Sequence, residues 1–445
     1  DMDMVSCGFL NTLEESLKEG KVTEEQINAA CRRVLEAKYK LGLFSDPYKY
    51  CDTLRVEKEL YTTAHRAVAR KIAAETFVLL KNEDHLLPLE RKGKIALIGP
   101  MADARNNMCG MWSMTCTPSR HGTLLEGIRS AAGDKAEILY ARGSNIYHDA
   151  ELEKGGAGIR PLERGNELQL LDEALHTAAR ADVIVAALGE CAEMSGESAS
   201  RTELGIPDAQ QDLLKALVKT GKPVVLLLFT GRPLVLNWED ANVHSILNVW
   251  FGGSETGDAI ADVLFGKVTP GGKLTTTFPR SVGQLPLYYN HLNTGRPDPD
   301  SHSFNRYSSN YLDMSNEPLY PFGYGLSYTN FSYGNLQLSS DVLSKNGELT
   351  VSVTVTNDGD FDGYEIVQMY LHDIYAEISR PVKELKGFER IFLKKGESRE
   401  VKFVITEDDL RFYNSGLQYV YEPGEFDVMV GANSRDVQTE RFRAD

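Results

Sequence analysis

Short apolar runs alternate with helical patterns over residues 65–280, and this alternation limits the possible folds most strongly. The runs share apolar and β-branched residues; they are "KIALIGP", "AEILYAR", "DVIVAALGE", "PVVLLLFTG" and "HSILNVWF". Stretches with helical spacing lie at 64–82, 166–181, 208–220 and 255–266. Strands that are apolar on both faces are typical of parallel sheets covered by helices on each side. The sequence therefore predicts an α/β sandwich with a mainly parallel sheet over residues 61–285.

The hydrophobic period changes to two in the last part of the chain. In "ELTVSVTVTNDGD", apolar residues from Leu349 to Val355 alternate with polar ones and end at an Asn-Asp-Gly turn. The same alternation recurs up to "GEFDVMVGANS". Alternation of this kind predicts a β-sandwich of roughly seven strands over residues 326–445. Residues 286–325 are rich in Pro, Asn, Ser and Tyr, so we expect them to form a connecting segment.

The first part of the chain has helical periodicity over residues 11–43. One apolar stripe is formed by Ile27, Ala30, Val34, Ala37 and Leu41. Thr23 and Gln26 have the spacing of a capping box, and Gly42 is placed to end the helix. The stretch "SDPYKY" then begins a linker. Because "DMDMVSCGFL" does not resemble a natural start, we expect the chain to be a fragment.

Composition excludes several classes of function. The chain has 445 residues and a formal net charge of −16. Nucleic-acid binding requires clustered Lys and Arg, so this charge argues against nucleic acid as a partner. Apolar runs fall well short of the roughly 20 residues needed to span a bilayer, so a membrane protein is not expected. A neutral small-molecule substrate is compatible with these properties.

Common cofactor and metal motifs are not matched. The stretch "GKVTPGGK" at 266–273 has the wrong spacing for a P-loop and lacks the Ser or Thr after the Lys, so it is read as tight turns. A Gly-x-Ser-x-Gly elbow does not occur. The Cys and His residues do not follow a zinc-site spacing. We therefore expect no cofactor and no metal.

Cys109 and Cys116 flank the loop "CGMWSMTC". They would be able to form a disulfide in an oxidising compartment. The commoner outcome for such residues is a pair of free, small hydrophobic side chains, which is the outcome we expect here.

Acidic residues crowd one loop that follows the run "DVIVAALGE". They are Glu190, Glu193, Glu197 and Glu203. An ordinary solvated acidic loop is the simplest interpretation. However, the Ser, Gly and Ala residues around Glu197 would let the backbone approach a ligand closely, and Arg201 lies near enough to influence the acid. A carboxylic acid that protonates a leaving group would fit this position.

Several long stretches together resemble the carboxyl-terminal two-thirds of a family 3 glycoside hydrolase of the bacterial periplasmic β-glucosidase type. In chain order, they are "RRVLEAKYKLGLFSDPY", "TFVLLKNEDHLLPL", "MSGESASRTEL", "PLYPFGYGLSYTNFSY" and "RPVKELKGFERIFLKKGES". The resemblance implies that residues 1–60 are the last strand and helix of a (β/α)₈ barrel with its linker. The α/β sandwich and a fibronectin type III-like domain would follow.

The resemblance also implies a chemistry, namely retaining hydrolysis of terminal β-D-glucosyl residues. The acid/base glutamate of the family falls on Glu197. The family's nucleophile is a barrel aspartate in a motif that does not occur here, and it does not fall on Asp1 or Asp3. In retaining enzymes the two carboxyl groups lie only about 5–5.5 Å apart, which explains an acid on a loop that reaches beyond its own domain. We expect the isolated chain to be inactive without the barrel.

Two alternatives remain open at this point. The enzyme alternative is a β-xylosidase of the same family. The other is a non-catalytic scaffold that binds carbohydrate or a partner chain, which the missing nucleophile favours. The expected partners are a β-glucoside or oligosaccharide, the barrel segment as a separate chain, and a second copy in a homodimer. By resemblance, the expected location is periplasmic or secreted.

Overall fold

The structure is a computed structural model that describes residues 1–113, 116–153, 163–297 and 305–445. It divides into two compact units, Asp1–Arg66 and Ala67–Asp445. Within the described ranges, no helix has both the length and the apolar character needed to cross a membrane.

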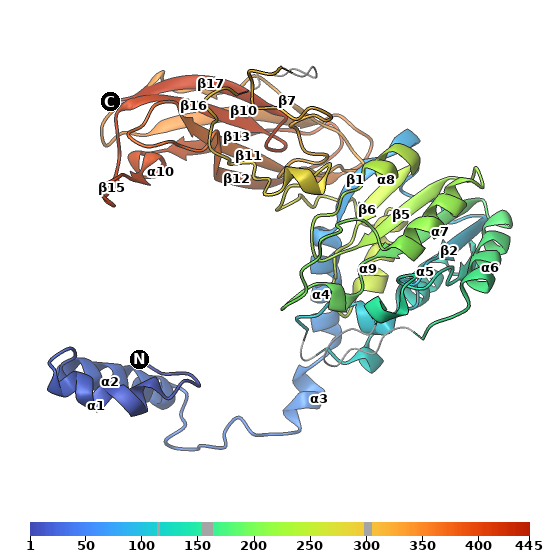
Figure 1. Ribbon diagram of the computed structural model, residues 1–445, viewed down its shortest axis with the longest axis horizontal. Helices are drawn as coiled ribbons and strands as arrows, with labels where there is room; N and C mark the ends of the chain where they lie inside the picture. Colours follow the sequence, from blue (N-terminus) through green and yellow to red (C-terminus); the bar gives the residue numbers. More distant parts are fainter. Residues whose placement is uncertain (114–115, 154–162, 298–304) are drawn as a thin grey trace. The chain divides into compact units, whose positions relative to one another are not determined.

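Along the chain, a helical part is followed by a mixed part and then by a mainly β part (Figure 1). The α-helices are α1 Gly8–Lys18, α2 Glu24–Lys40, α3 Arg55–Glu59, α4 Thr63–Thr76, α5 Leu124–Ala132, α6 Glu167–Ala179, α7 Asp208–Val218, α8 Asn237–Asn242, α9 Thr256–Leu264 and α10 Glu407–Leu410. The strands up to residue 300 are β1 Val78–Asn82, β2 Lys94–Ile98, β3 Glu137–Ala141, β4 Val183–Gly189, β5 Val224–Phe229 and β6 Ser245–Asn248. The later strands are β7 Phe331–Tyr333, β8 Gln337–Leu338, β9 Val342–Leu343, β10 Leu349–Asn357, β11 Gly363–Asp373, β12 Glu384–Leu393, β13 Ser398–Ile405, β14 Phe412–Tyr413, β15 Tyr419–Val420, β16 Gly424–Gly431 and β17 Val437–Ala444.

The first unit contains the helix that its periodicity predicted. The Thr23 hydroxyl accepts a hydrogen bond from the Gln26 backbone at 3.2 Å, and the Gln26 side chain accepts one from the Thr23 backbone at 2.8 Å. This capping box opens α2, as expected, and Gly42 follows its end with a φ of 75°. Residues 1–7, all of them described, form no strand. A barrel strand is held by hydrogen bonds to its neighbours, and such neighbours are not part of this unit.

The second unit begins with a six-stranded sheet in the order β1-β6-β5-β4-β2-β3. Strands β2 to β6 pair in parallel, as predicted, whereas β1 pairs antiparallel with β6. The prediction of one helix over residues 64–82 was wrong for residues 77–82, because α4 ends at Thr76 and β1 follows. Only Glu75 and Thr76 separate the buried alanines at the end of α4 from the apolar run that begins at Phe77, so the change from helix to strand is not marked by a turn signal in the sequence.

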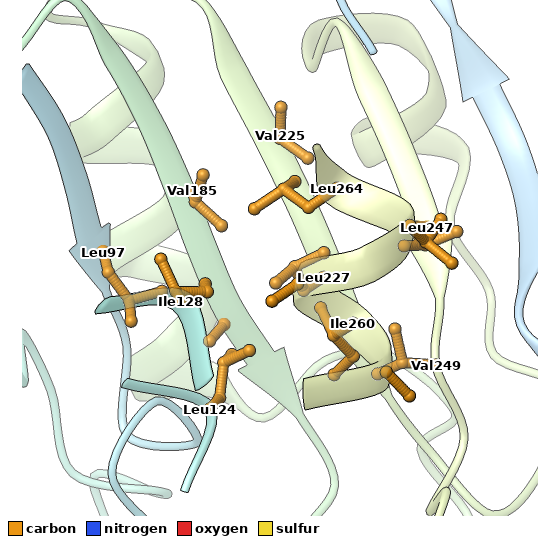
Figure 2. Packing of buried hydrophobic residues seen from close by; sticks show 14 of the residues in the cluster. Leu97, Leu124, Ile128, Val185, Val225, Leu227, Leu247, Val249, Ile260 and Leu264 are labelled. Carbon is orange, nitrogen blue, oxygen red and sulfur yellow. The ribbon is translucent and has the colours of Figure 1, made fainter. Parts of the chain in front are cut away.

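Both faces of this sheet are covered by helices, which confirms the α/β sandwich. Side chains alternate along β5. Leu227 packs in a cluster with Ile128 of α5 and Ile260 of α9 (Figure 2). Leu226 packs on the opposite face in a cluster with Leu214 of α7. The strands are therefore buried on both sides, and polar chemistry is confined to their ends and the loops that follow.

The β-sandwich consists of two larger sheets with one core between them. One has the order β13-β10-β7, with β8 also paired to β10, and the other has the order β12-β11-β16-β17-β9. Val353, Val428 and Phe442 belong to the shared core. The structure has more strands than the roughly seven expected, because β7, β8 and β9 are too short to show alternation in the sequence.

A buried ion pair joins the α/β part of the second unit to its β-sandwich. The amine of Lys273 lies 3.0 Å from a carboxylate oxygen of Glu365 on β11 and donates to the Gly325 carbonyl at 2.9 Å. The Tyr333 hydroxyl donates to the same carboxylate at 3.3 Å. Each charge in this junction is thus satisfied by partners from different segments.

Candidate functional site

The ends of β4 and β5 lie side by side because these strands pair in parallel and in register, with Gly189 opposite Phe229. Glu190 follows β4 directly, and its backbone donates to the Phe229 carbonyl at 2.7 Å. Thr230 and Gly231 follow β5. The loops beyond the carboxyl ends of parallel strands are the usual place for ligands in α/β sheets. The acidic loop predicted from the sequence starts at this edge.

The carboxylate of Glu190 is fully buried and satisfied by its surroundings. One oxygen accepts a hydrogen bond from Arg201 at 2.8 Å and lies 3.0 Å from Nε of Arg232, which approaches without hydrogen-bond alignment. The other oxygen accepts from the Thr230 hydroxyl at 2.9 Å and the Gly231 backbone at 3.1 Å. A charge held in this way fixes the loop and is not presented to a substrate.

Arg232 also closes the neck of the loop. Its Nη2 donates to the carbonyl oxygen of Met194 and, at 2.7 Å, to that of Ala199. Residues 195–198 therefore form a short tip between two points held by one guanidinium group. Arg201 fixes the returning strand of the loop, since its Nη2 donates to the Gly205 carbonyl at 3.1 Å.

Glu197 lies at this tip and is exposed. Within the described ranges, no residue forms a hydrogen bond or ion pair with its carboxylate. Both flanking residues have positive φ angles, 108° at Gly196 and 58° at Ser198. A Cβ at position 196 would lie 2.9 Å from the Met111 side chain, so glycine allows the tip to pass close to the loop that holds Met111.

The base of the loop is held by two buried amides. The side chain of Gln210, on α7, donates to the Gly189 carbonyl and accepts from the Gly189 backbone, both at 2.9 Å. The carbonyl oxygen of the Asn107 side chain accepts from the Ala192 backbone at 2.9 Å. These bonds make the loop rigid at its base and leave the tip open to solvent.

The remaining predicted acids lie in different environments. Glu203 is exposed, whereas Glu193 is partly buried. The four acids therefore do not form one uniformly solvated loop, because Glu190 is inside the protein.

Two other titratable groups near the loop are also affected by burial. Burial raises the pKa of the Cys191 thiol to about 11. Burial also raises the pKa of Tyr147, and the charge of Arg201 opposes this rise.

The sequence did not indicate Arg232 and Gln210 as parts of this site. Arg232 comes from the turn after β5, and Gln210 from the helix after the loop. The only signal was position: both lie in segments that flank parallel strands, next to the loop in space.

The structure joins Cys109 and Cys116 in a disulfide, so the expectation of two free thiols was wrong. His121 is buried against this pair, with Nε2 3.7 Å from the sulfur of Cys109 and 3.5 Å from that of Cys116. Burial lowers the pKa of His121. Between the two cysteines, Trp112 is exposed and borders the tip at Gly196.

Two family models match the chain. Residues 77–328 match the glycosyl hydrolase family 3 C-terminal domain, and residues 365–434 match the fibronectin type III-like domain. The first match includes the whole acidic loop, and the second lies inside the β-sandwich.

Named relatives and solved structures are similar over nearly the whole chain. A periplasmic beta-glucosidase of Salmonella typhimurium is 46% identical over 99% of this chain and 58% of its own length. A beta-xylosidase of Formosa agariphila is 38% identical over 98% of this chain and 58% of its own length. The structure of a beta-glucosidase from Listeria innocua in complex with isofagomine has a TM-score of 0.87 and 37% identity, covering 100% of this chain and 59% of that one. The chain thus spans less than two thirds of the length of these relatives.

Proposed function

Because the chain belongs to glycosyl hydrolase family 3, we propose that it supplies the acid/base half of a retaining β-glucosidase active site. The substrate class would be a β-glucoside or oligosaccharide with a terminal non-reducing β-D-glucosyl residue. The names of the Salmonella and Listeria relatives support this choice of substrate.

We assign the acid/base role to Glu197. The observation that carries the assignment is the contrast between two carboxylates of one loop. Glu190 is buried and held by Arg201 and Arg232, whereas Glu197 is exposed at the tip of a loop whose neck is fixed. Only an accessible carboxyl group is able to reach the oxygen of a glycosidic bond.

In this proposal Glu197 acts twice. It first protonates the leaving oxygen while a nucleophile outside this chain attacks the anomeric carbon. It then removes a proton from the water that hydrolyses the covalent intermediate. The two carboxyl groups must approach to about 5–5.5 Å for this sequence of steps. The rigid base of the loop would hold the acid at the required position.

The nucleophile and the sugar-gripping residues would lie in a barrel outside residues 61–445, and residues 1–60 would be the end of that barrel. In this proposal the rest of the chain consists of the α/β sandwich at 61–285, the connecting segment at 286–325 and the fibronectin type III-like domain at 326–445. The isolated chain would then have little activity, because one of the two required carboxylates comes from elsewhere. We also propose a periplasmic or secreted location, supported by the name of the Salmonella relative.

A β-xylosidase is the second candidate, because the Formosa relative that is 38% identical bears that name. The acid loop would serve both enzymes equally, since protonation of the leaving oxygen does not depend on the sugar's C5 substituent. Comparing kcat/KM for aryl β-glucosides and aryl β-xylosides would separate these candidates.

The acid/base role is tested in the complete protein that carries this chain. Glu197→Ala should slow hydrolysis of an alkyl β-glucoside by roughly 10²–10⁴-fold, the usual contribution of a positioned acid. With a dinitrophenyl glucoside the glycosylation step, read as kcat/KM, should be affected much less, because that group leaves without protonation. The covalent intermediate should then persist, because its hydrolysis lacks the base. Azide should restore turnover by replacing the activated water as acceptor.

The matched control is Glu203→Ala, which removes another exposed acid of the same loop. It should show neither the dependence on the leaving group nor the azide rescue. Rescue in the Glu203 variant, or its absence in the Glu197 variant, would contradict the assignment. Glu193→Ala and Glu190→Ala should also show no rescue, although Glu190→Ala should disturb the loop itself.

A further inference from the structure

A second group of potentially reactive side chains lies beside the acid loop and has no part in the proposed hydrolysis. Cys109, Cys116 and His121 each offer one donor atom, and these atoms all lie within 4.8 Å of one another. The two sulfurs are joined as a disulfide. We propose that, once this disulfide is reduced, the three side chains bind a thiophilic cation such as Zn²⁺.

The distances from the imidazole to the sulfurs support this inference. In tetrahedral sites Zn–S bonds are about 2.3 Å and Zn–N bonds about 2.0–2.1 Å, which places sulfur and nitrogen about 3.6 Å apart. Nε2 of His121 lies 3.7 Å and 3.5 Å from the two sulfurs. Both distances from His121 to the sulfurs therefore already match those expected around a shared cation. Only the sulfurs must separate, to about 3.8 Å by the same geometry.

The orientation of His121 also suits a ligand. Its Nδ1 lies 3.4 Å from the Gly122 carbonyl oxygen, so the tautomer that donates there directs the lone pair of Nε2 toward the sulfurs. A backbone carbonyl on the second ring nitrogen is the usual support of a metal-bound histidine. The His121 ring is buried, and its main-chain carbonyl accepts from Arg105.

Arg105 connects this histidine to a helix end. Its guanidinium also donates to the side chain of Glu126, which accepts from the Thr123 backbone at 2.9 Å in the capping box of α5. His121 is therefore held in place by the start of α5. Two thiolates and one imidazole leave a fourth position for water, and soft sulfur ligands favour Zn²⁺ or Cu⁺ over Mg²⁺ or Ca²⁺.

The conversion of the disulfide into the metal site requires two electrons and two protons, which a thiol–disulfide couple supplies. A dithiol reductant transfers two electrons and two protons to the disulfide, which becomes two thiols, and the reductant is itself oxidised to a disulfide. Cation binding then releases the two thiol protons, because thiolates are the ligands. A disulfide oxidant reverses the first step by accepting two electrons, and this removes two of the three ligands.

The test uses the full chain, reduced and freed of metal under anaerobic conditions and titrated with Co²⁺ and then Zn²⁺. One Co²⁺ per chain should produce sulfur-to-cobalt charge-transfer absorption and the visible bands of a tetrahedral site, and Zn²⁺ should displace it. His121→Asn should weaken binding at least tenfold. Cys109→Ser or Cys116→Ser should weaken binding and reduce the thiolate signal, and the variant that carries both changes should abolish it. The oxidised chain should give no such signal.

Matched controls exclude the other cysteines and histidines. Cys31→Ser and His176→Asn remove exposed side chains and should leave the titration unchanged. Zn²⁺ should protect Cys109 and Cys116 from alkylation by iodoacetamide, as read by mass spectrometry, while Cys7 stays reactive. Circular dichroism of each variant identifies those that fail to fold.

Three results would overturn the proposal. The first is a thiolate signal that persists in the folded variant lacking both Cys109 and Cys116. The second is a folded His121→Asn chain that binds as tightly as the original. The third is a disulfide that stays unreduced as long as the chain remains folded, because the site would then never form.

Discussion

The carboxylate of Glu190 accepts a hydrogen bond of 2.8 Å from the guanidinium of Arg201, which lies eleven residues further along the chain. This bond joins the outgoing and returning strands of the loop that carries Glu197. Because Arg232 adds a second positive charge 3.0 Å from the same oxygen, the start of the loop is held from two directions. The loop therefore depends on a buried charge that takes no part in the proposed chemistry.

Replacing Glu190 with Gln should destabilise the protein. The substitution leaves the guanidinium groups of Arg201 and Arg232 close together without a counter-charge. Breaking a buried ion pair on one side costs about 3–5 kcal/mol. Urea unfolding of the chain would measure the loss, and Glu203→Gln, which changes an exposed acid, should stay within about 0.5 kcal/mol. Equal stability of the two variants would contradict the role given to Glu190.

Replacing Arg232 with Lys should lower activity without removing the acid. An ammonium group is not expected to span the carbonyls of both Met194 and Ala199, so the tip would lose one of its two fixed points. A misplacement of about 1 Å at a reacting group costs on the order of 10²-fold in rate. In the complete enzyme kcat should fall by roughly 10–10²-fold.

Azide distinguishes this effect from loss of the acid itself. It should not rescue the Arg232→Lys variant, since the carboxylate of Glu197 is still present and would repel the anion. Rescue equal to that of Glu197→Ala would show that Arg232 has a different role. Lys219→Arg, on the exposed side beyond α7, serves as a control for a change of basic side chain elsewhere.

The Lys273–Glu365 junction should tolerate joint replacement better than single replacement. Lys273→Met leaves the Glu365 carboxylate buried without its cation and should cost about 3–5 kcal/mol. Adding Glu365→Leu removes the stranded charge and should recover most of that loss. Thermal and urea unfolding of both variants would measure the difference. A double variant less stable than Lys273→Met would contradict this account of the junction.

Asp373 should make stability depend on pH in the acidic range. Burial raises the pKa of its carboxyl group to about 6, Arg380 opposes that rise, and Glu422 and Glu384 add to it. Because the folded pKa exceeds the unfolded value of about 3.9, the folded chain keeps a proton on Asp373 that the unfolded chain releases first. The contribution of this carboxyl group to the free energy of unfolding is therefore complete below pH 4 and is lost as pH rises through 6.

The variant Asp373→Asn stays neutral throughout this range. Its free energy of unfolding relative to the wild type should therefore increase by about 1–3 kcal/mol between pH 4 and pH 7. Asp341→Asn, an exposed change in the same β-sandwich, should show no such trend. A constant difference for Asp373→Asn across pH would mean that the carboxyl group titrates normally.

The layered part of the fold could be predicted because its signals are local. Apolar strands such as Val224–Phe229 and the alternation in Leu349–Asn357 are visible within one short window. The strand β1 was missed because it follows α4 without a Gly, Pro or Asn to mark the boundary, and pairing with β6 makes it a strand. Sequence patterns within a short window do not predict an element whose structure depends on pairing with a distant strand.

The candidate site was predictable only in part for the same reason. Glu197 could be found from its small neighbours and from family resemblance. The arginine that fixes it, Arg232, follows a different strand, and its place depends on the register between β4 and β5. Similarly, His121 meets the two cysteines through folding of its own segment, without any recognisable ligand spacing.

The neck closed by Arg232 has a consequence for how the acid would be delivered. A carboxyl group on a freely moving segment samples a large volume, and its effective concentration at any one point is low. Between Met194 and Ala199 the chain has too few residues to wander far, since each one spans at most about 3.6 Å. The entropy of placing the proton donor is therefore lost during folding and not during each turnover. The rate of proton transfer from Glu197 would then depend on the stability of the sheet edge that holds the loop.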